Sequence, residues 1–341
     1  MKIIHTGDLH LKKFYRGRVP LEVSNKLLED IWHSFSSLCD FSNKVDADIF
    51  LIAGDLFERD FFDLKDLERL LDLIKNLSAK VFVVFGNHDY LAKDNLFLKV
   101  DLPENLYIFK DELDFYELKE LNTRVYGISY NNYNFRKEFQ EINLDKSFIN
   151  IGLFHSDLCD NRYMPLSEDF LKDFSYVALG HIHKRGKAFD NAYYCGSLTS
   201  LSFKEEGEHG IIFLDDDRKK IEFKNFSKRK FVNLEIKINS EMTFFEILKK
   251  VRSEIEKENL YRIKLVGSHR HFIEIENFLK ENLDAFYFEL ENEVLPERDL
   301  ENFKIEEKHI LELLNSFSDK DMEKDARKLS EKYILEQYYD I

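Results

Sequence analysis

The chain has 341 residues, of which 44% are apolar and 34% are charged, and its formal net charge is −15 at pH 7. This composition is typical of a folded globular protein, and a single hydrophobic core usually stops growing at about 250 residues, so we expect more than one domain. The acidic balance argues against a general affinity for nucleic acid, because that affinity depends on lysine and arginine contacts to phosphates, and any contact with DNA must be local.

Short apolar runs alternate with segments of helical spacing over the first ninety residues. The runs at 3–4, 49–53 and 81–85 predict strands, and the segments 21–41 and 64–77 predict helices. This order predicts a layered α/β core. Ligands bind beyond the carboxyl ends of the strands in such sheets, so the polar residues that follow each run are candidates for a functional site.

More strands complete the predicted first domain, and a smaller α/β pattern follows it. The additional strands are predicted at 106–109, 124–128, 149–154, 176–179, 193–195, 211–214 and 221–223. The charged stretch 226–230 predicts a domain boundary. Beyond it, strands at 231–238, 261–266 and 285–290 alternate with helices at 244–255 and 272–279.

We therefore predict a large domain at 1–227, a small α/β domain at 228–295 and a helical segment at 296–341. Within the helical segment, an amphipathic helix carries Met322, Ala326, Leu329 and Tyr333 on the same face. This helix either packs on the preceding domain or binds a partner protein.

Seven polar residues at or just after predicted strands have the chemistry of metal ligands. They are Asp8, His10, Asp55, Asn87, His155, His181 and His183. A site for two ions needs a carboxylate that bridges them, and Asp55 at the end of the central run is the candidate for this role. Asp8 and His10 are two residues apart, which in an extended segment directs both side chains to one ion. His181 and His183 have the same spacing and could serve the two different ions.

The mixed set of carboxylate, amide and imidazole groups suits Mn²⁺ or Fe²⁺ and also tolerates Zn²⁺, so we expect two divalent ions drawn from these metals. His88 lies between Asn87 and Asp89, outside the ligand set but close to it. We predict that His88 is the general acid, or the group that stabilises the transition state, in the hydrolysis of a phosphoester. Each motif alone is weak, but no structural need explains polar clusters at five strand ends.

The ordered motifs DLH, GDLF, GNHD, His155 and GHIH resemble the calcineurin-like metallophosphoesterase superfamily over roughly residues 1–225. The GDLF motif with the later segments CGSL at 195–198 and SFKE at 202–205 is similar to the SbcD family and its YhaO-type relatives. A weaker similarity to the YhaO-type accessory domain lies at 260–265. The resemblance implies a layered β-sandwich flanked by helices, a small α/β capping domain and C-terminal helices that dock an ATPase.

The resemblance also implies metal-ligand roles for the same seven residues and a catalytic role for His88. Its partners would be DNA and an SMC-like ATPase of the SbcC or YhaN type, and a homodimer is a further expectation. The Ser/Thr protein phosphatases of the superfamily favour GDxxDRG, whereas here Glu58, Arg59 and Asp60 follow the GDLF motif's Phe57. This departure disfavours a protein phosphatase.

The leading hypothesis is a Mn²⁺-dependent DNA exonuclease or endonuclease of double-strand-break repair. Two local basic segments directly follow candidate ligands and could hold the phosphate backbone without reading sequence. Their candidate DNA-binding residues are Lys12, Lys13, Arg16 and Arg18 in the first, and Lys184 and Arg185, with Lys187 beside them, in the second. The simpler interpretation is that both are ordinary solvated loops. The alternatives are a small-molecule phosphodiesterase or phosphatase and a non-catalytic DNA-tethering subunit.

The three cysteines, Cys39, Cys159 and Cys195, are far apart and form no CxxC pair. Neither a disulfide framework nor a thiolate metal site is indicated, and a reducing cytoplasm fits this usage. The sequence shows neither a signal peptide nor 18 consecutive apolar residues, so we expect a cytoplasmic protein with no membrane association.

Overall fold

The computed structural model describes residues 1–296 except 14, 16–17, 138, 140–141, 161, 206 and 216–219. The chain divides into two compact units, Met1–Phe231 and Val232–Ile341. Among the described residues, no helix combines the length and the apolar character that crossing a membrane requires.

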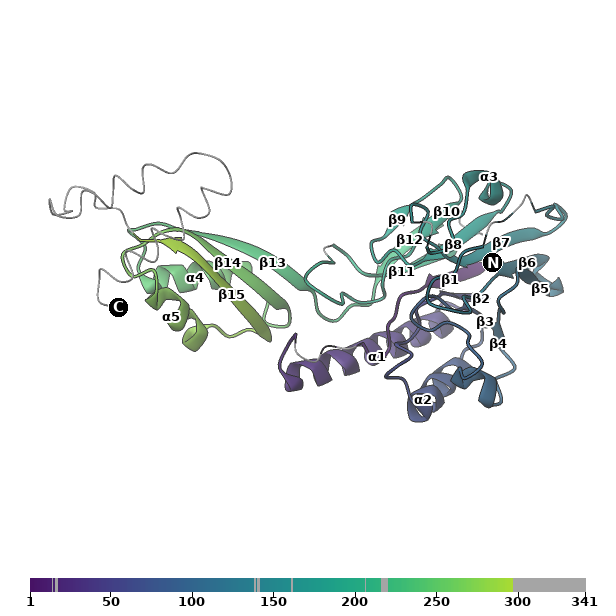
Figure 1. The fold of residues 1–341 in the computed structure, drawn as a ribbon, viewed down its shortest axis with the longest axis horizontal. Coiled ribbons are helices and arrows are strands. Elements are labelled where there is room, and N and C mark those ends of the chain that lie inside the picture. Colours follow the sequence, from purple (N-terminus) through teal and green to yellow (C-terminus); the bar gives the residue numbers. More distant parts are fainter. Residues whose placement is uncertain are drawn as a thin grey trace. The chain divides into compact units, whose positions relative to one another are not determined.

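The first unit contains two six-stranded sheets (Figure 1). The first sheet has the order β12-β11-β1-β2-β3-β4, in which β1 to β4 are parallel and β11 and β12 antiparallel to their neighbours. Its strands are β1 (Lys2–Thr6), β2 (Ile49–Ala53), β3 (Lys80–Val84), β4 (Leu106–Ile108), β11 (Gly210–Asp215) and β12 (Lys220–Asn225).

The second sheet has the order β5-β6-β7-β8-β10-β9, with β6, β7, β8 and β10 parallel. Its strands are β5 (Asp114–Leu118), β6 (Thr123–Gly127), β7 (Ile149–His155), β8 (Tyr176–Gly180), β9 (Gly186–Lys187) and β10 (Ala192–Tyr194). Short helices lie between strands, namely α3 (Glu168–Leu171) and the 3₁₀ turns η1 (Leu96–Lys99) and η2 (Lys119–Leu121).

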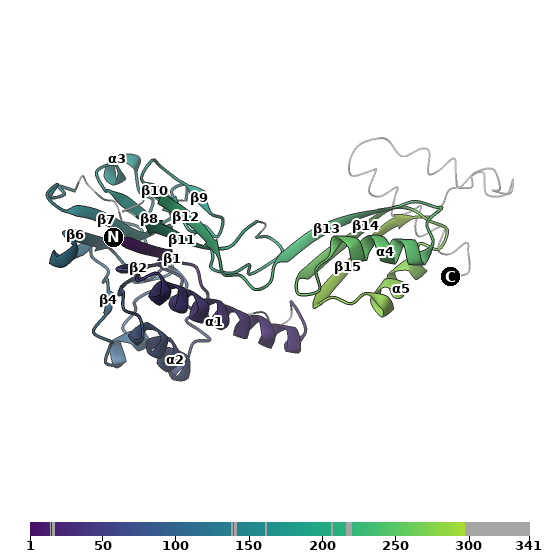
Figure 2. The same ribbon diagram turned by 180° about the vertical axis from the view of Figure 1, so that it is seen from behind.

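Two helices cover the outer face of the first sheet, as both ribbon views show (Figures 1 and 2). They are α1 (Leu21–Lys44) and α2 (Leu64–Lys75). The side chain of Asp63 accepts hydrogen bonds from the first free amide groups of α2, which explains where that helix begins. Phe35 of α1 packs edge-on against Phe50 of β2.

The inner faces of the two sheets form a common core. Alternate residues of β2, such as Leu51 and Ala53, pack with Ile151 and Leu153 of β7, and all four are fully buried. This alternation follows from the pleat of a strand, which sends successive side chains to opposite faces. The core holds the carboxyl ends of both sets of parallel strands in fixed positions at one edge.

The second unit has a three-stranded sheet of order β13-β14-β15 and two helices. Its elements are β13 (Phe231–Ile238), α4 (Phe244–Glu254), β14 (Leu260–Ser268), α5 (Glu274–Asn282) and β15 (Tyr287–Leu295). Thr243 and Glu246 form a reciprocal cap at the start of α4. Ile247 and Leu279 pack with apolar strand residues in a separate core.

The predicted fold class is confirmed, since mixed sheets flanked by helices form the first unit and a small α/β arrangement forms the second. The sequence patterns missed β5 and β9. Most of β5 lies at the sheet surface, so the five residues show no clear apolar alternation, and β9 has only two residues. The predicted helical segment at 296–341, with its apolar face from Met322 to Tyr333, lies outside the described residues apart from residue 296.

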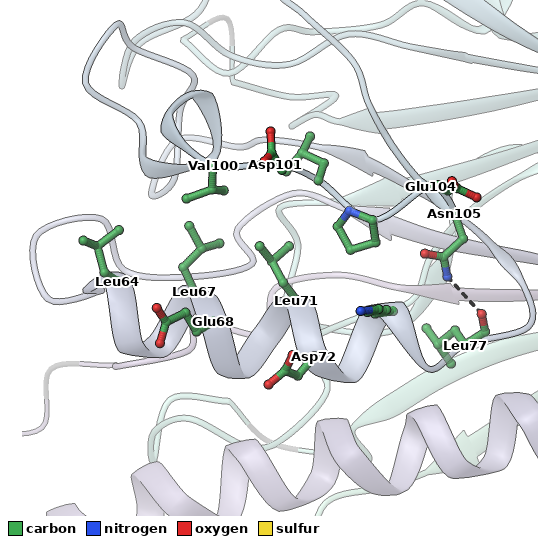
Figure 3. Close-up of a pocket in the computed structure, with 13 residues that line it drawn as sticks. Leu64, Leu67, Glu68, Leu71, Asp72, Leu77, Val100, Asp101, Glu104 and Asn105 are labelled. Carbon is green, nitrogen blue, oxygen red and sulfur yellow. Dashed lines mark hydrogen bonds between the residues drawn. The ribbon is translucent and has the colours of Figure 1, made fainter.

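A groove of about 940 Å³ runs between α2 and the segment 100–105 (Figure 3). Leu64, Leu67 and Leu71 line its helical wall, and Glu68 and Asp72 lie at its margin. It contains none of the predicted metal ligands.

Candidate metal centre

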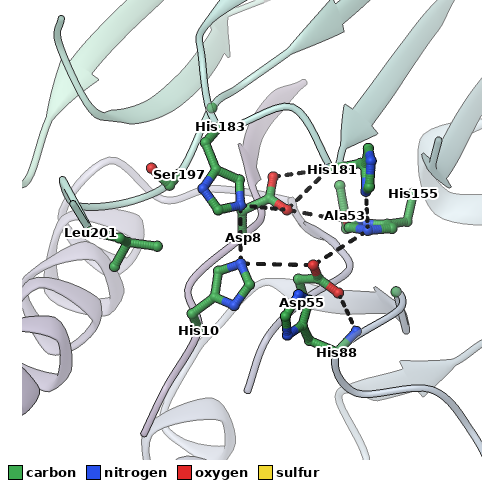
Figure 4. A network of polar contacts seen from close by, with 12 residues as sticks. Asp8, His10, Ala53, Asp55, His88, His155, His181, His183, Ser197 and Leu201 are labelled. Carbon is green, nitrogen blue, oxygen red and sulfur yellow. Dashed lines mark hydrogen bonds and ion pairs between the residues drawn. The ribbon is translucent and has the colours of Figure 1, made fainter. Parts of the chain in front are cut away.

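The seven predicted ligands come together at the edge where the parallel strands of both sheets end. Figure 4 shows six of them, all except Asn87. Asp8 and His10 follow β1, Asp55 follows β2 and Asn87 follows β3. His155 is the last residue of β7, and the turn after β8 carries His181 and His183. Six of the seven side chains form two groups, and the seventh, Asp55, lies against both.

The first group consists of Asp8, His10 and His183. The Nε2 atoms of His10 and His183 are 3.0 Å apart, and His183 Nε2 lies 4.0 Å from Asp8 Oδ1. The Nδ1 atom of each ring is held by a carboxylate, His10 by Glu58 at 2.8 Å and His183 by Glu205 at 3.0 Å. An Nδ1–H that donates to a carboxylate leaves the lone pair on Nε2, which therefore faces the centre of the group.

The second group consists of Asn87, His155 and His181. Asn87 Oδ1 lies 3.0 Å from His155 Nε2 and 3.2 Å from His181 Nδ1, and the two ring nitrogens are 3.2 Å apart. His155 Nδ1 donates to the carbonyl oxygen of Ala53 at 2.9 Å. As in the first group, this bond leaves the other ring nitrogen free to coordinate. His181 and His183 thus belong to different groups.

Asp55 lies between the two groups. Its Oδ2 atom is 3.7 Å from His10 Nε2 and 3.5 Å from His155 Nε2, while its Oδ1 atom accepts a hydrogen bond from the backbone of His88 at 2.9 Å. The carboxylate is only 2% exposed. A buried carboxylate with one oxygen facing imidazoles of both groups has the position that a bridging ligand requires.

Four of the ligand-bearing residues have a left-handed backbone. The φ angles are 50° at Asp8, 48° at His10, 49° at Asp55 and 92° at His181. The expectation that Asp8 and His10 lie in an extended segment is therefore wrong, although both side chains do face the same group. Non-glycine residues adopt this region at a cost, and such residues concentrate where a side chain must be aimed at a site.

Two glycines allow the turns to approach the imidazole of His155. A Cβ atom on Gly54 would lie 2.4 Å from His155 Nδ1, and one on Gly86 would lie 2.3 Å from Asp55 Oδ1. Both distances are shorter than any real contact. The buried Asp89 ties these turns together, since its carboxylate accepts hydrogen bonds from the amides of Gly86 and Leu56 at 2.6 Å each.

Glu58 is the residue that connects the predicted catalytic His88 to the first group. One carboxylate oxygen contacts His10 Nδ1 and the other contacts His88 Nδ1, both at 2.8 Å. Burial opposes ionisation, but the hydrogen bonds and charges of the two histidines outweigh it and hold the pKa of Glu58 far below its usual value. The His88 side chain is 33% exposed, and one of its ring nitrogens lies within 4.8 Å of ligand atoms of His10 and Asp55.

The charges around the centre leave most of the ligands in the form that coordinates metal. Burial lowers the pKa of His10 and of His181 to about 4, so both rings are neutral at physiological pH. Burial raises the pKa of Asp8 to about 6. His183 differs: although burial opposes its protonation, Glu205 and Asp8 raise its pKa to about 9. A protonated His183 ring places a positive charge beside the carboxylates of Asp8 and Glu205.

Sequence reasoning did not assign a role to Glu58 or Glu205. Both lie in loops far along the chain from the histidines that they contact, at separations of 48 residues for His10 and 22 for His183. The only signal was the position of Glu58 three residues after Asp55 and of Glu205 at the end of the SFKE segment.

We predict that Glu205→Ala weakens metal binding, because His183 loses the carboxylate that fixes its ring. Groups that orient a ligand typically contribute about 10- to 100-fold in affinity. Glu205→Gln, which keeps an acceptor oxygen, should lose less. Titration calorimetry with Mn²⁺ measures the change, and the exposed neighbour Glu208 provides a control as Glu208→Ala. Equal affinities of the parent and Glu205→Ala would contradict the role.

Several of the predicted DNA-binding residues pair with acidic residues. Lys12 lies 3.2 Å from Asp66, and Lys13 lies 3.4 Å from Glu58. Arg185 lies 3.8 Å from a Glu208 oxygen and stacks on Phe223. The side chains of Arg18 and Lys184 are exposed, and Lys187 pairs with Asp190 at 2.7 Å. Arg16 lies outside the described residues.

The donor set fits two divalent cations. Nitrogen and oxygen ligand atoms face one another in both groups, at separations of about a hydrogen bond, and a cation is the partner that satisfies several of them at once. No cysteine belongs to the candidate ligand clusters of the described residues. Asp157 lies 3.6 Å from His181 Nε2, the ring nitrogen that faces away from the second group.

Comparison with known proteins agrees with this geometry. The YhaO protein of Bacillus subtilis, described as an uncharacterized metallophosphoesterase, is 29% identical over 231 residues, which are 62% of this chain and 56% of YhaO. The SbcD component of the SbcCD nuclease of Staphylococcus saprophyticus is 24% identical over 242 residues, 60% of this chain and 62% of that protein. The chain therefore spans roughly three fifths of the length of these relatives. The sequence profile of the calcineurin-like phosphoesterases matches residues 1–185, and the chain belongs to this family of metal-dependent phosphoesterases.

Proposed function

We propose that the chain is a two-metal phosphodiesterase that cleaves DNA. The observation that carries the proposal is the position of Asp55, whose carboxylate faces an imidazole of each group while its second oxygen binds the backbone of His88. This arrangement suits two ions that share one carboxylate, with a proton-transferring side chain beside them.

The roles of the residues follow from their contacts. Asp8, His10 and His183 would hold one ion, Asn87, His155 and His181 the other, and Asp55 both. When bound, such ions activate water and neutralise the charge on a phosphoryl oxygen. His88 faces the same space and would protonate the leaving oxygen or stabilise the transition state. Glu58 holds the His88 ring through Nδ1, so that Nε2 is the atom directed to the substrate.

DNA as the substrate is supported by the nuclease component among the relatives and by the exposed Arg18 and Lys184, which follow ligand-bearing turns. The same relative is one subunit of a nuclease named for two components, so we propose that an SMC-like ATPase of the SbcC or YhaN type is the partner of this chain. The small second unit and the segment 296–341 would cap the site and dock that partner. Action in double-strand-break repair in the cytoplasm and a homodimer belong to the same proposal.

A small-molecule phosphodiesterase is the second candidate. The net charge of −15 favours it, as do the ion pairs that occupy Lys12 and Lys13. A small substrate needs only the two groups and His88, whereas a polyanion needs free positive side chains along its backbone.

The decisive assay offers labelled linear DNA and a chromogenic phosphodiester to the purified protein, each with Mn²⁺, Mg²⁺ or a chelator. Cleavage of DNA with Mn²⁺ and none with chelator supports the nuclease. Hydrolysis of the chromogenic ester alone supports the small-molecule enzyme, and hydrolysis of neither overturns both enzymatic proposals.

Reversing two exposed charges is expected to change DNA cleavage selectively. In the variant Arg18→Glu with Lys184→Glu, the Michaelis constant for DNA should rise and the slope of its logarithm against log salt should fall by about one for each phosphate that the protein no longer neutralises. Hydrolysis of the chromogenic ester should not change. Lys146→Glu is the control, since residue 146 precedes β7 and lies at the opposite edge of the sheet from His155. Equal losses on both substrates would indicate a damaged metal centre instead.

A further inference from the structure

Two tyrosines border the metal centre and take no part in either group of ligands. The Tyr133 ring centroid lies 6.1 Å from that of His88 and 6.3 Å from that of Tyr163. The Tyr163 ring in turn lies 4.6 Å from the ring of His181. The two rings thus form an aromatic wall, defined here as Tyr133 and Tyr163, which extends from the predicted proton donor to the second group.

The loop that carries Tyr133 is held at both ends. Tyr130 on one side is fully buried, and its backbone pairs with Phe85 at 2.9 Å and with Leu91 at 2.7 Å. Phe135 on the other side is also buried, and its carbonyl oxygen accepts from the amide of Met164 at 2.9 Å. The side chain between these anchors therefore has a defined place beside the centre.

Tyr133 itself is 49% exposed, although its neighbours Tyr130 and Phe135 supply the apolar packing of the loop. Asn131, Asn132 and Asn134 around it are exposed as well. Burial and a hydrogen bond with Tyr133 raise the pKa of Tyr163. An exposed aromatic ring set among amide groups offers stacking and hydrogen bonds but no positive charge for a phosphate.

Aromatic side chains in this position are suited to nucleobases. A base that stacks on an aromatic ring contributes about 1–3 kcal/mol, and the contact tolerates any base because every base has a π face. A base inside a duplex is already stacked on its neighbours and cannot reach such a ring without leaving the helix. An aromatic wall next to the scissile phosphate therefore favours an unpaired strand.

We propose that Tyr133 stacks on the nucleobase next to the scissile phosphate and that the site consequently prefers single-stranded DNA. The inference rests on the proposed nuclease function and adds the class of substrate to it. Tyr163 supports Tyr133 from the side of the second group. The metal centre would bind the phosphate and Tyr133 would stack on the base, so the two contacts involve different parts of the substrate strand.

The test compares a single-stranded oligothymidine with an oligonucleotide of the same length in which abasic sugars replace the nucleosides. Tyr133→Ala should raise the Michaelis constant for oligothymidine by roughly 5- to 150-fold, which corresponds to the energy of one stacked base. The abasic substrate, which keeps every phosphate, should show no change. Tyr133→Phe should behave as the parent, and Tyr133→Leu should resemble the alanine variant. Phe245→Ala, at an aromatic residue of α4 that is 75% exposed, is the control.

Equilibrium binding of fluorescent oligothymidine in the presence of chelator gives a second readout that does not depend on turnover. The parent should bind oligothymidine more tightly than the abasic oligomer, and Tyr133→Ala should remove that difference. Cleavage of DNA with an unchanged Michaelis constant in Tyr133→Ala would overturn the stacking role alone. A parent that hydrolyses the chromogenic diester but neither oligonucleotide would overturn the proposed nuclease and this inference together.

Discussion

Asp55→Asn is expected to lower turnover by on the order of a thousandfold. Two-ion sites contribute several kcal/mol to stabilising the transition state, and each 1.4 kcal/mol corresponds to a factor of ten. The amide keeps the size of the side chain and one acceptor oxygen, but it removes the charge that lies within 3.7 Å of His10 and 3.5 Å of His155. Steady-state hydrolysis of the chromogenic diester at saturating Mn²⁺ measures the loss.

Metal content distinguishes the reasons for that loss. Elemental analysis of dialysed Asp55→Asn should find fewer than two ions per chain, whereas the parent should hold two. Asp145→Asn changes an exposed carboxylate that precedes β7 and should leave both quantities unaltered. Two ions and full turnover in Asp55→Asn would show that the carboxylate does not bridge.

His88→Asn should lower turnover by about a hundredfold or more, the usual contribution of a group that transfers a proton. It should leave metal content unchanged if His88 transfers a proton, as proposed, and is not a further ligand beside His10 and Asp55, whose ligand atoms lie within 4.8 Å of a His88 ring nitrogen. Lower turnover with unchanged metal content would support a proton-transfer role for His88. Loss of metal from His88→Asn would make the residue a ligand.

Glu58 gives a second test of the same arrangement. Glu58 acts partly through His88. The double variant Glu58→Gln with His88→Asn should therefore raise the activation free energy by less than the sum of the increases in the two single variants. Glu58 also holds the ring of His10. Glu58→Gln should therefore weaken Mn²⁺ binding, whereas His88→Asn should not. If the free-energy effects of the two substitutions simply add, Glu58 does not act through His88.

The sequence alone predicted which residues gather at the sheet edge, because each lies where an apolar run ends and the carboxyl ends of parallel strands meet on one side. It predicted the strands β2 and β13 to the residue. It could not place Glu58 or Glu205, whose contacts join loops that meet only in the folded chain. It also missed the ion pairs of Lys12 and Lys13, since both acidic partners come from beyond the local segment that the pattern considered.

The backbone conformation of the ligand residues was the other feature that the spacing of apolar and polar residues could not predict. Spacing suggested that Asp8 and His10 lie in an extended segment, whereas the chain aims them through left-handed turns. Periodicity reports which face a residue occupies within a regular element, and these residues follow the element rather than belong to it.

The left-handed conformations at Asp8, His10 and Asp55 have a consequence for selection experiments. Glycine adopts this region without steric cost, so a glycine at any of these three positions would relieve strain in the backbone. Every such variant would have lost a donor atom of the centre. Backbone strain and metal binding are thus opposed at these residues. A screen for a more stable enzyme should keep Asp8, His10 and Asp55 and vary the residues around them.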